Sequence, residues 1–409
     1  MAASDDVEDE LRERLRRYPH DRYPVQHATA QFHLGTVLLN GDRSGEAAAA
    51  LRASVSGFDP QRLPVEHAKA TNMLGAALRA LGDLPGAATA FERAATVFER
   101  NAMAAEEAAA RYNLGLVHRA SGRDAAAVGC FERALRGFDE VRLAGQASAA
   151  ARELGATLLS TGDADAAAAV LQRAVDAASH AGDHAALGAA ANALGLAHLA
   201  ADRAAEAVAA FRTAAVAHPR SVRPDGYAMA QANLALAHER LADPPRARLA
   251  ARQALGVPAA PEPVRAQAAE VIARLGPAAG DVLTVLRVED AERWEPIVRA
   301  EVARWADAPA GARRSAVGEW VDGSLADPGR GPELARALLG ALLELPSPTM
   351  DAVVRTLLET VSERSAADGQ RFRVELSRAM GFFHVPQWLR LKDTFNRLAG
   401  ELGQDPSWG

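Results

Sequence analysis

The feature that most constrains this chain is a Leu-Gly pair that recurs every 40 residues. The pair stands at Leu34-Gly35, Leu74-Gly75, Leu114-Gly115, Leu154-Gly155 and Leu194-Gly195, with Leu234-Ala235 as a sixth copy. Counted from each Leu, a turn residue follows after 8 positions, an Ala after 13 and a small residue after 20. A large apolar residue follows after 17 positions in five of the six copies. A fixed period of this length indicates an array of similar supersecondary units.

Each unit is predicted to be a hairpin of two helices. The turn position holds Gly82, Gly122 and Gly162 in three copies, and glycine adopts the left-handed conformation that ends a helix at little steric cost. The glycine after each leucine lets the second helix approach closely, and a Phe or Leu beside small residues sets how the two helices pack. One hairpin cannot bury its apolar faces alone, so the copies are expected to stack into a solenoid with a continuous core.

The pattern resembles the tetratricopeptide repeat, which has a Leu-Gly pair in its first helix and Gly, Ala, Phe and Ala in its turn and second helix. Pro219 also stands where that family often places a proline after the second helix. The period of 40 exceeds the common 34, as in the repeat arrays of some bacterial scaffolds and regulators, and the family's first-helix Trp is absent. The resemblance implies an all-α fold, a right-handed α-α superhelix of the tetratricopeptide type.

The chain divides into four predicted regions. Residues 1–26 are expected to form an N-terminal capping helix or arm, and residues 27–260 contain the six hairpins. The segment AQAAEVIARLG echoes the start of the sixth repeat, so residues 261–288 are predicted to be a degenerate seventh hairpin. All five tryptophans lie beyond residue 281, where the period of 40 ends. We therefore expect residues 289–409 to form a C-terminal helical domain with an extended tail, of no family that we recognise.

Composition and motifs argue against several classes of protein. The 409 residues carry a formal net charge of −6, which is unlike a general nucleic-acid binder. The single cysteine, Cys130, excludes a cysteine-cluster metal site, and we expect it to be a buried, inert thiol. The sequence has no glycine-rich phosphate loop, nucleophile elbow or His-Glu-x-x-His motif. We therefore expect no catalytic residues, metal ligands or cofactor, and we do not expect an enzyme.

Two residue groups that could bind a ligand are predicted to be structural. His118, His198 and His238 each lie four residues after a repeat leucine. Packed helices lie about 8–10 Å apart, too far for histidines of adjacent repeats to share one metal ion at about 2 Å each. The segment Met380–His384, Met-Gly-Phe-Phe-His, is predicted to belong to the core because Met and Phe are usually buried.

The chain ends and apolar runs predict a cytoplasmic protein without membrane contact. The start, MAASDDVEDE, is acidic, whereas a secretion signal needs positive charge followed by an apolar stretch. The uncharged run from His184 to Ala201 is in register with the repeat and reads as a buried helix rather than a membrane span.

The family resemblance also implies a binding groove. In that family the first helix of each hairpin lines the concave surface, through positions −5, −2, −1, +2, +5 and +6 relative to the leucine. The polar residues at these positions are Lys69, Asn72, Arg79, Tyr112, Asn113, Arg119, Arg152, Glu153, Asn192, Asn233, Glu239 and Arg240. Repeats 2–4 thus contribute four cations and one carboxylate. A basic stripe of this kind attracts an anionic partner, and arginine binds carboxylates through two hydrogen bonds.

These observations lead to one main hypothesis and two alternatives. The main hypothesis is a scaffold or adaptor that binds an acidic peptide or helix of a protein partner in the groove. The first alternative is a signalling or transcription-associated regulator whose C-terminal helices are the effector. The second is an enzyme or small-molecule binder with a pocket between the solenoid and the C-terminal domain, lined by tryptophans and His384. The oligomeric state is left open.

Overall fold

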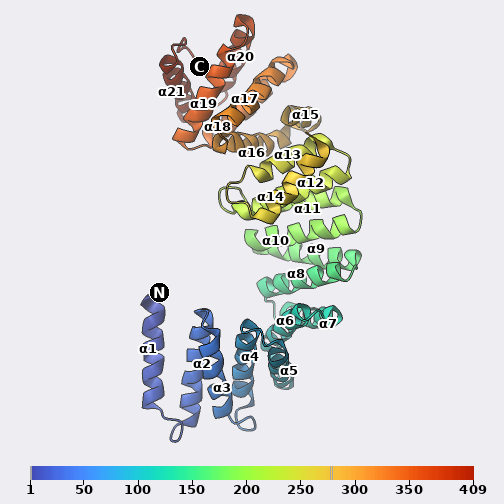
Figure 1. The fold of residues 1–409 in the computed structure, drawn as a ribbon, viewed down its shortest axis with the longest axis vertical. Coiled ribbons are helices and arrows are strands. Elements are labelled where there is room, and N and C mark those ends of the chain that lie inside the picture. The colour runs from blue at the N-terminus through green and yellow to red at the C-terminus, as the bar shows by residue number, and fades with distance from the viewer. Residues whose placement is uncertain (1, 277, 279) are drawn as a thin grey trace. The chain divides into compact units, whose positions relative to one another are not determined.

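A computed structural model describes residues 2–276, 278 and 280–409 (Figure 1). Within these ranges every regular element is a helix, so the predicted all-α fold is confirmed. The chain forms two compact units, Met1–Arg203 and Ala204–Gly409. Among the described residues, no helix combines the length and the apolarity that crossing a membrane requires.

The first unit is a row of helices in which each helix packs against the next one along the chain (Figure 1). It contains α1 (Ala2–Arg17), α2 (Pro24–Asn40), α3 (Ser44–Gly57), α4 (Pro64–Ala80), α5 (Leu84–Arg100), α6 (Ala104–Ala120), α7 (Asp124–Glu140), α8 (Ala144–Ser160), α9 (Ala164–Ala181) and α10 (His184–Ala200). Helix α1 buries Leu11 against α2. The pairs α2/α3, α4/α5, α6/α7 and α8/α9 are the predicted hairpins.

The glycine of each Leu-Gly pair explains why the two helices of a hairpin lie so close. A Cβ atom added to Gly75 would lie 2.9 Å from the ring of Phe91, and one added to Gly115 would lie 2.7 Å from the ring of Phe131. Both phenylalanines are fully buried. A larger residue at the glycine would therefore displace the one large side chain around which the hairpin packs, and the predicted close approach is confirmed.

The turns between the paired helices also follow the prediction. Gly82, Gly122 and Gly162 have φ angles of 81°, 68° and 87°, which is the left-handed region that glycine tolerates. The same position has a positive φ at Asp42 and Ala242, with values of 58° and 53°. The repeat therefore keeps the turn conformation even where it does not keep the glycine.

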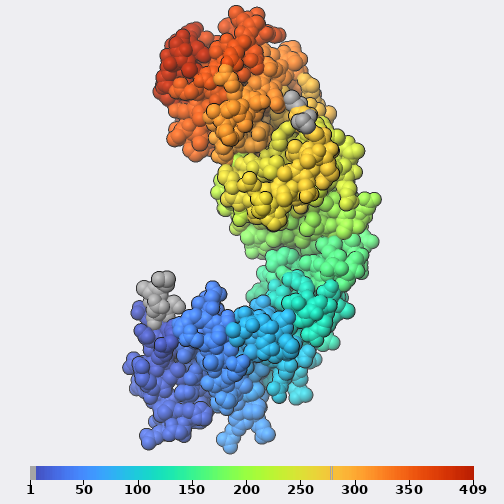
Figure 2. Space-filling model, in the orientation of Figure 1, coloured from blue at the N-terminus to red at the C-terminus, as the bar shows by residue number. Residues whose placement is uncertain are grey.

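The second unit begins with hairpin helices and continues into a rounded helical body (Figures 1 and 2). Its elements are α11 (Ala204–Ala217), α12 (Pro224–Arg240), α13 (Pro244–Leu255), α14 (Glu262–Leu275), α15 (Asp281–Val288), η1 (Ala291–Arg293), α16 (Trp294–Asp307), α17 (Ala310–Leu325), η2 (Pro328–Arg330), α18 (Gly331–Leu343), α19 (Ser347–Ser362), α20 (Ala366–Met380) and α21 (Val385–Glu401). Helix α14 packs on α12 and α13, and α15 packs on α13 and α16.

A single hydrophobic cluster runs from α13 through the C-terminal helices. Trp305 and Trp320 are fully buried and their rings meet edge to face, with centroids 5.8 Å apart. Aromatic pairs of this geometry contribute beyond the apolar area that they bury. The helices beyond α15 therefore pack around large aromatic side chains, with no periodic pattern.

The C-terminal tail docks onto α20 and α21. Trp408 is buried against Phe395, with ring centroids 5.2 Å apart, and the guanidinium of Arg373 lies 5.1 Å from the Trp408 ring centroid. The side chain of Asn396 accepts a hydrogen bond from the Trp408 amide at 2.7 Å and donates one to its carbonyl at 3.3 Å. The tail is thus held by helices of its own unit.

Candidate functional site

The inner face of the first unit is the surface formed by the predicted groove positions of α4, α6, α8 and α10. Lys69 and Arg79 of α4 are exposed. The remaining predicted positions of this unit are half-buried: Asn72, Tyr112, Asn113, Arg119, Arg152, Glu153 and Asn192. Cationic side chains of three successive hairpins therefore reach one surface.

Five of these residues form a cluster, which we call the basic cluster: Arg79, Tyr112, Arg119, Arg152 and Glu153. Arg119 donates a short hydrogen bond to Glu153, and Arg152 lies 3.5 Å from the other oxygen of the same carboxylate. Tyr112 lies at the centre. Burial, together with the charge of Glu153, raises the pKa of its phenol, while the three arginines oppose that shift. The phenol therefore stays protonated and able to donate a hydrogen bond.

The positive charge of this surface exceeds what the chain itself neutralises. Arg119 and Arg152 share the single carboxylate of Glu153. In the part of the chain that the structure describes, neither Lys69 nor Arg79 has an ion-pair partner. The inner face thus offers two unpaired exposed cations beside a pair of arginines that share one anion.

The inner face also has an apolar part, which lies outside the set of polar residues predicted from the sequence. Leu196, two positions after the repeat leucine of α10, is 40% exposed. Leu116 stands at the same repeat position in α6 and is half-buried. Position +2 belongs to the predicted lining, but a leucine at that position is also what a buried core residue would be, so the sequence does not distinguish the two.

The prediction is wrong at Asn233. This residue is buried, and its side-chain oxygen accepts a hydrogen bond from Gln267 of α14 at 3.0 Å. Glu239, predicted to line the same stretch, pairs with Arg274 of α14 at 2.7 Å. Helix α14 therefore covers the face of α12 that was expected to be open, and Asn233 is not available to a partner.

His118, His238 and Cys130 lie away from the inner face. His118 and Cys130 contact a cavity between α5, α6 and α7, and His238 contacts one between α11, α12 and α13. Burial lowers the pKa of His118 and raises that of Cys130, so both are held in their neutral forms. Among the described residues, no cluster of three or more His, Cys, Asp or Glu side chains could hold a metal ion.

The segment Met380–His384 is only partly core. Met380 is fully buried, but Phe382 is 75% exposed and His384 is exposed. The prediction that the whole segment is buried is therefore wrong. The chain turns here between α20 and α21, and a turn of this length presents only some of its side chains to the core.

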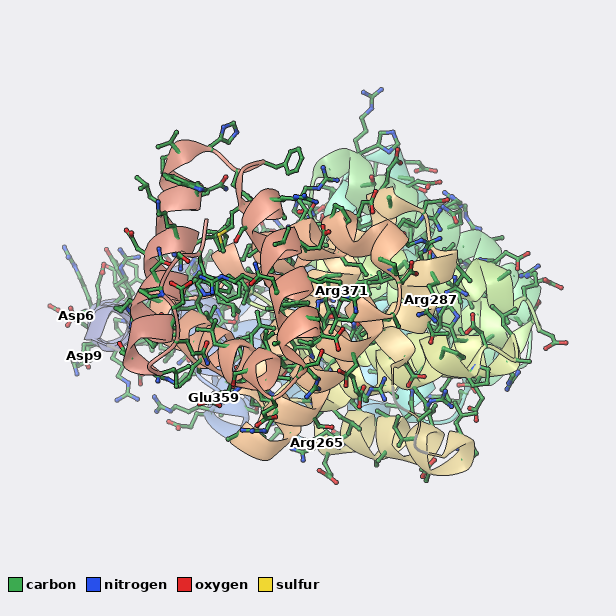
Figure 3. The ribbon with its side chains drawn as sticks, turned by 90° about the horizontal axis from the view of Figure 1, so that it is seen from above. Asp6, Asp9, Arg265, Arg287, Glu359 and Arg371 are labelled. Atoms are coloured by element: carbon green, nitrogen blue, oxygen red, sulfur yellow. The ribbon has the colours of Figure 1, made fainter. Side chains whose placement is uncertain are left out.

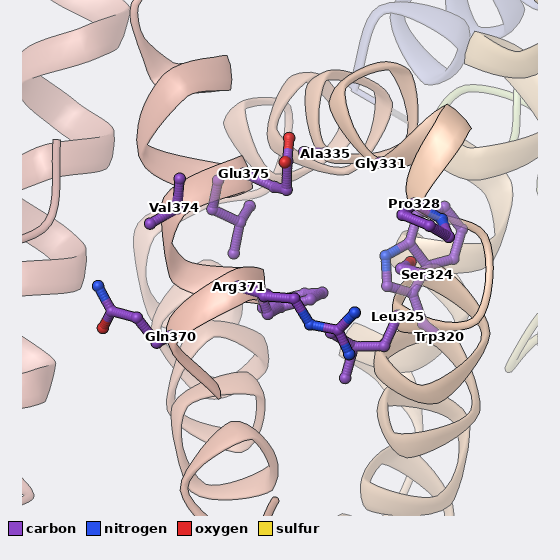
Figure 4. A pocket seen from close by; sticks show the side chains of 12 residues that line it. Trp320, Ser324, Leu325, Pro328, Gly331, Ala335, Gln370, Arg371, Val374 and Glu375 are labelled. Atoms are coloured by element: carbon purple, nitrogen blue, oxygen red, sulfur yellow. The ribbon is translucent and has the colours of Figure 1, made fainter. Parts of the chain in front are cut away.

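Among the cavities of the described part of the second unit, two are large enough to consider as ligand sites. One of about 210 Å³ lies between α17, η2, α18 and α20 and is largely apolar, with Trp320 at its wall and Arg371 reaching across it (Figure 4). Buried Ser324 contacts this cavity, and its hydroxyl has no hydrogen-bond partner. The other, of about 450 Å³, lies where α11–α13 meet α15 and α16. Neither is lined by His384, and the second is lined by arginines rather than tryptophans.

The fold and surface define a class of protein: stacked antiparallel helix hairpins that present one polar face of their first helices. Profiles of the tetratricopeptide repeat match residues 66–140 and 125–182. Residues 66–182 therefore match the tetratricopeptide repeat, in agreement with the resemblance seen in the sequence. No curated protein sequence matches the chain.

Solved structures of similar fold include the apo form of RapI, which is 8% identical with a TM-score of 0.50, covering 92% of this chain and 97% of that one. The apo form of the quorum sensor NprR from B. thuringiensis is 11% identical with a TM-score of 0.46, over 87% of this chain and 88% of its own. PilF of Pseudomonas aeruginosa is 15% identical with a TM-score of 0.45, over 60% and 97%. At these identities the likeness concerns the fold alone.

Proposed function

We propose that this protein is an interaction protein that binds an acidic segment of a partner along the inner face of α4, α6 and α8. Tetratricopeptide arrays generally serve protein–protein interaction. The observation that carries the proposal is the basic cluster, in which arginines of three hairpins act on Tyr112 and one carboxylate, that of Glu153, offsets their charge. A surplus of cations on a chain of net charge −6 concentrates positive potential at one place and attracts anionic partners there.

The chemistry of the surface suggests what such a segment contains. Lys69 and Arg79 are exposed and can each pair with a carboxylate of the partner, arginine through two parallel hydrogen bonds. The Tyr112 phenol can donate to a backbone carbonyl or a carboxylate. Leu196 and Leu116 give the same face an apolar stretch. We therefore infer a segment that combines acidic residues with a few apolar ones, in a cytoplasmic setting, with micromolar affinity of about −8 kcal/mol.

The test uses residues whose replacement breaks no ion pair among the described residues. Lys69→Glu with Arg79→Glu reverses two exposed charges on α4. Arg93→Glu with Arg100→Glu makes the same charge change on α5, where both arginines are also exposed. Tagged wild type and both double variants are used to capture partners from the native host, which are then quantified by mass spectrometry.

We expect the α4 double variant to lose partners that wild type and the α5 double variant retain. Retention by all three proteins would contradict the proposed surface. Circular dichroism spectra of the three proteins should coincide, because none of the four residues is buried. Capture of nucleic acid in place of protein would favour the regulator alternative.

A further inference from the structure

Cavities also lie between the second helices of some consecutive hairpins, and we call the grooves that hold them outer grooves. Each has the first helix of the later hairpin as its floor, which contributes residues at positions −3, 0 and +4 of the repeat. The groove between α3 and α5 holds a cavity of about 640 Å³ over α4, and that between α5 and α7 one of about 490 Å³ over α6. The groove between α11 and α13 holds about 450 Å³ over α12.

The groove between α11 and α13 differs because the chain returns over it. Helices α15 and α16 and the turn between them add Val285, Glu289, Arg293, Pro296 and Ile297 to its lining. A volume of about 450 Å³ falls in the range of about 300–1,000 Å³ that small-molecule sites occupy. We call this closed groove the arginine pocket.

Three arginines from three segments meet one carboxylate in the arginine pocket. Glu289, whose side chain is only 5% exposed, lies 3.2 Å from Arg212 of α11, 2.8 Å from Arg246 of α13 and 3.7 Å from Arg293. Burial opposes ionisation of Glu289, but these guanidinium groups outweigh it and hold its pKa below the usual value. Arg246 also pairs with Asp243 at 2.5 Å, so three cations face two carboxylates and positive charge is left over.

The floor of the pocket supplies polar atoms in a largely apolar surround. His238 is only 7% exposed, contacts the pocket and has no hydrogen-bond partner at Nδ1. Gln231 donates to the hydroxyl of Tyr227 at 3.0 Å, and that hydroxyl lies 3.5 Å from Gln253. The remaining lining is apolar: Ala209, Ala215, Val216, Leu234, Leu249, Ala250, Val285, Pro296 and Ile297.

A buried polar atom without a partner is costly, because it loses its bonds to water and gains none in exchange. The Nδ1 of His238, like that of His118 at the same repeat position, is therefore available to bond a further group. The excess positive charge favours a ligand with an anionic group, and the apolar lining favours a ligand whose remaining part is apolar. Small-molecule sites commonly combine apolar walls with a few placed polar groups.

We propose that the arginine pocket binds a small amphipathic organic anion, whose acidic group pairs with Arg212 and Arg293 and whose apolar body lies between α11, α13 and α16. Arg246 is already engaged by Glu289 and Asp243, whereas Arg212 and Arg293 are partly exposed at 41% and 59% of their side chains. The site lies in the second unit and does not depend on the partner surface proposed above. Its ligand would bridge hairpin helices and C-terminal helices of that unit.

The test compares two probes that share one apolar body. 8-Anilinonaphthalene-1-sulfonate carries an anionic group, and N-phenyl-1-naphthylamine is its neutral analogue; both fluoresce more strongly in apolar sites. Titrations use the full-length wild type and the variants Arg212→Ala, Arg293→Ala and Ala209→Trp. Arg265→Ala is the matched control, because Arg265 is an exposed arginine of α14 outside the pocket (Figure 3).

Each arginine variant is expected to weaken binding of the sulfonate about tenfold and to leave binding of the neutral probe unchanged. Ala209→Trp, which places a large side chain at the exposed edge of the pocket, should weaken both probes, and Arg265→Ala should affect neither. Equal sulfonate affinity in wild type and both arginine variants would overturn the proposal. So would sulfonate binding that survives Ala209→Trp, since the probe would then lie elsewhere, for instance in the cavity beside Trp320. Circular dichroism checks that each variant is folded. The variants at Arg212 and Arg293 test the same prediction separately, so the result does not depend on one of them.

Discussion

The hairpin array and the C-terminal helices are both built of α-helices, yet they pack by different rules. In the array, one large side chain such as Phe131 fills the space that a glycine of the neighbouring helix leaves open, and the rest of the interface is mostly alanine. Beyond α15 the helices surround Trp305, Trp320 and other large residues in an aperiodic cluster. A packing rule that is repeated along the chain can therefore be recognised in the sequence, whereas a core that is assembled once cannot.

Removing a buried aromatic side chain should have the largest effect on stability, and it should show that the two regions have separate cores. Phe131→Ala and Trp320→Ala should each cost about 3–5 kcal/mol, because each removes a fully buried aromatic side chain. Each repeat contacts only its neighbours, so Phe131→Ala should accelerate hydrogen exchange in α6–α8 and leave α16–α21 unchanged. Trp320→Ala should do the reverse. Accelerated exchange throughout the chain in either variant would contradict the separation.

The next effect concerns the place where hairpin and C-terminal helices meet. Burial lowers the pKa of His238 from 6.5 to about 4, with further effects of Arg212, Asp243, Arg246 and Glu289. Between these two pH values the unfolded chain binds a proton that the folded chain does not, so stability falls as pH drops from about 6.5 to about 4. The loss attributable to His238 is up to about 3 kcal/mol.

Urea unfolding of the second unit across this pH range measures the effect. His238→Gln removes the titrating group and should flatten the stability profile between pH 6.5 and 4. His184→Gln is a suitable control, because His184 is exposed. Parallel profiles for wild type and His238→Gln would show that the histidine is not buried in its neutral form.

The smallest effect tests the turn that the repeats share. Gly122→Ala places a side chain at a φ of 68° and should cost about 1 kcal/mol. Ala242→Gly, at the same repeat position with a φ of 53°, should relieve strain and stabilise by up to about 1 kcal/mol. Thermal unfolding shows whether each variant is less or more stable than the wild type. The same sign for both would contradict a common turn conformation.

Much of the array could be predicted because its period places equivalent residues in equivalent surroundings. The Leu-Gly pairs and the turn position at Gly82 and Gly122 led directly to the hairpins and to their close approach. The gathering of Arg79, Arg119 and Arg152 near Tyr112 also follows from their repeat positions.

The remainder depends on contacts between segments that are distant in sequence. Asn233 is buried because α14, which carries its partner Gln267, packs over it. The repeat pattern does not predict where α14 packs. The arginine pocket brings together residues from Arg212 to Ile297. In the sequence, nothing distinguishes Glu289 from a carboxylate on the surface. Phe382 is exposed although its residue type predicts burial, because hydrophobicity predicts burial only on average.

The most direct test of the proposed function is the dissociation constant of the shortest partner segment that the protein captures, measured by fluorescence anisotropy at low and high salt. For wild type, the affinity should fall as salt increases, because exposed charges are screened within about 8–10 Å. The variant with Lys69→Glu and Arg79→Glu should bind at least about tenfold more weakly and show a flatter salt dependence. Equal dissociation constants and parallel salt curves for the two proteins would contradict binding along the inner face.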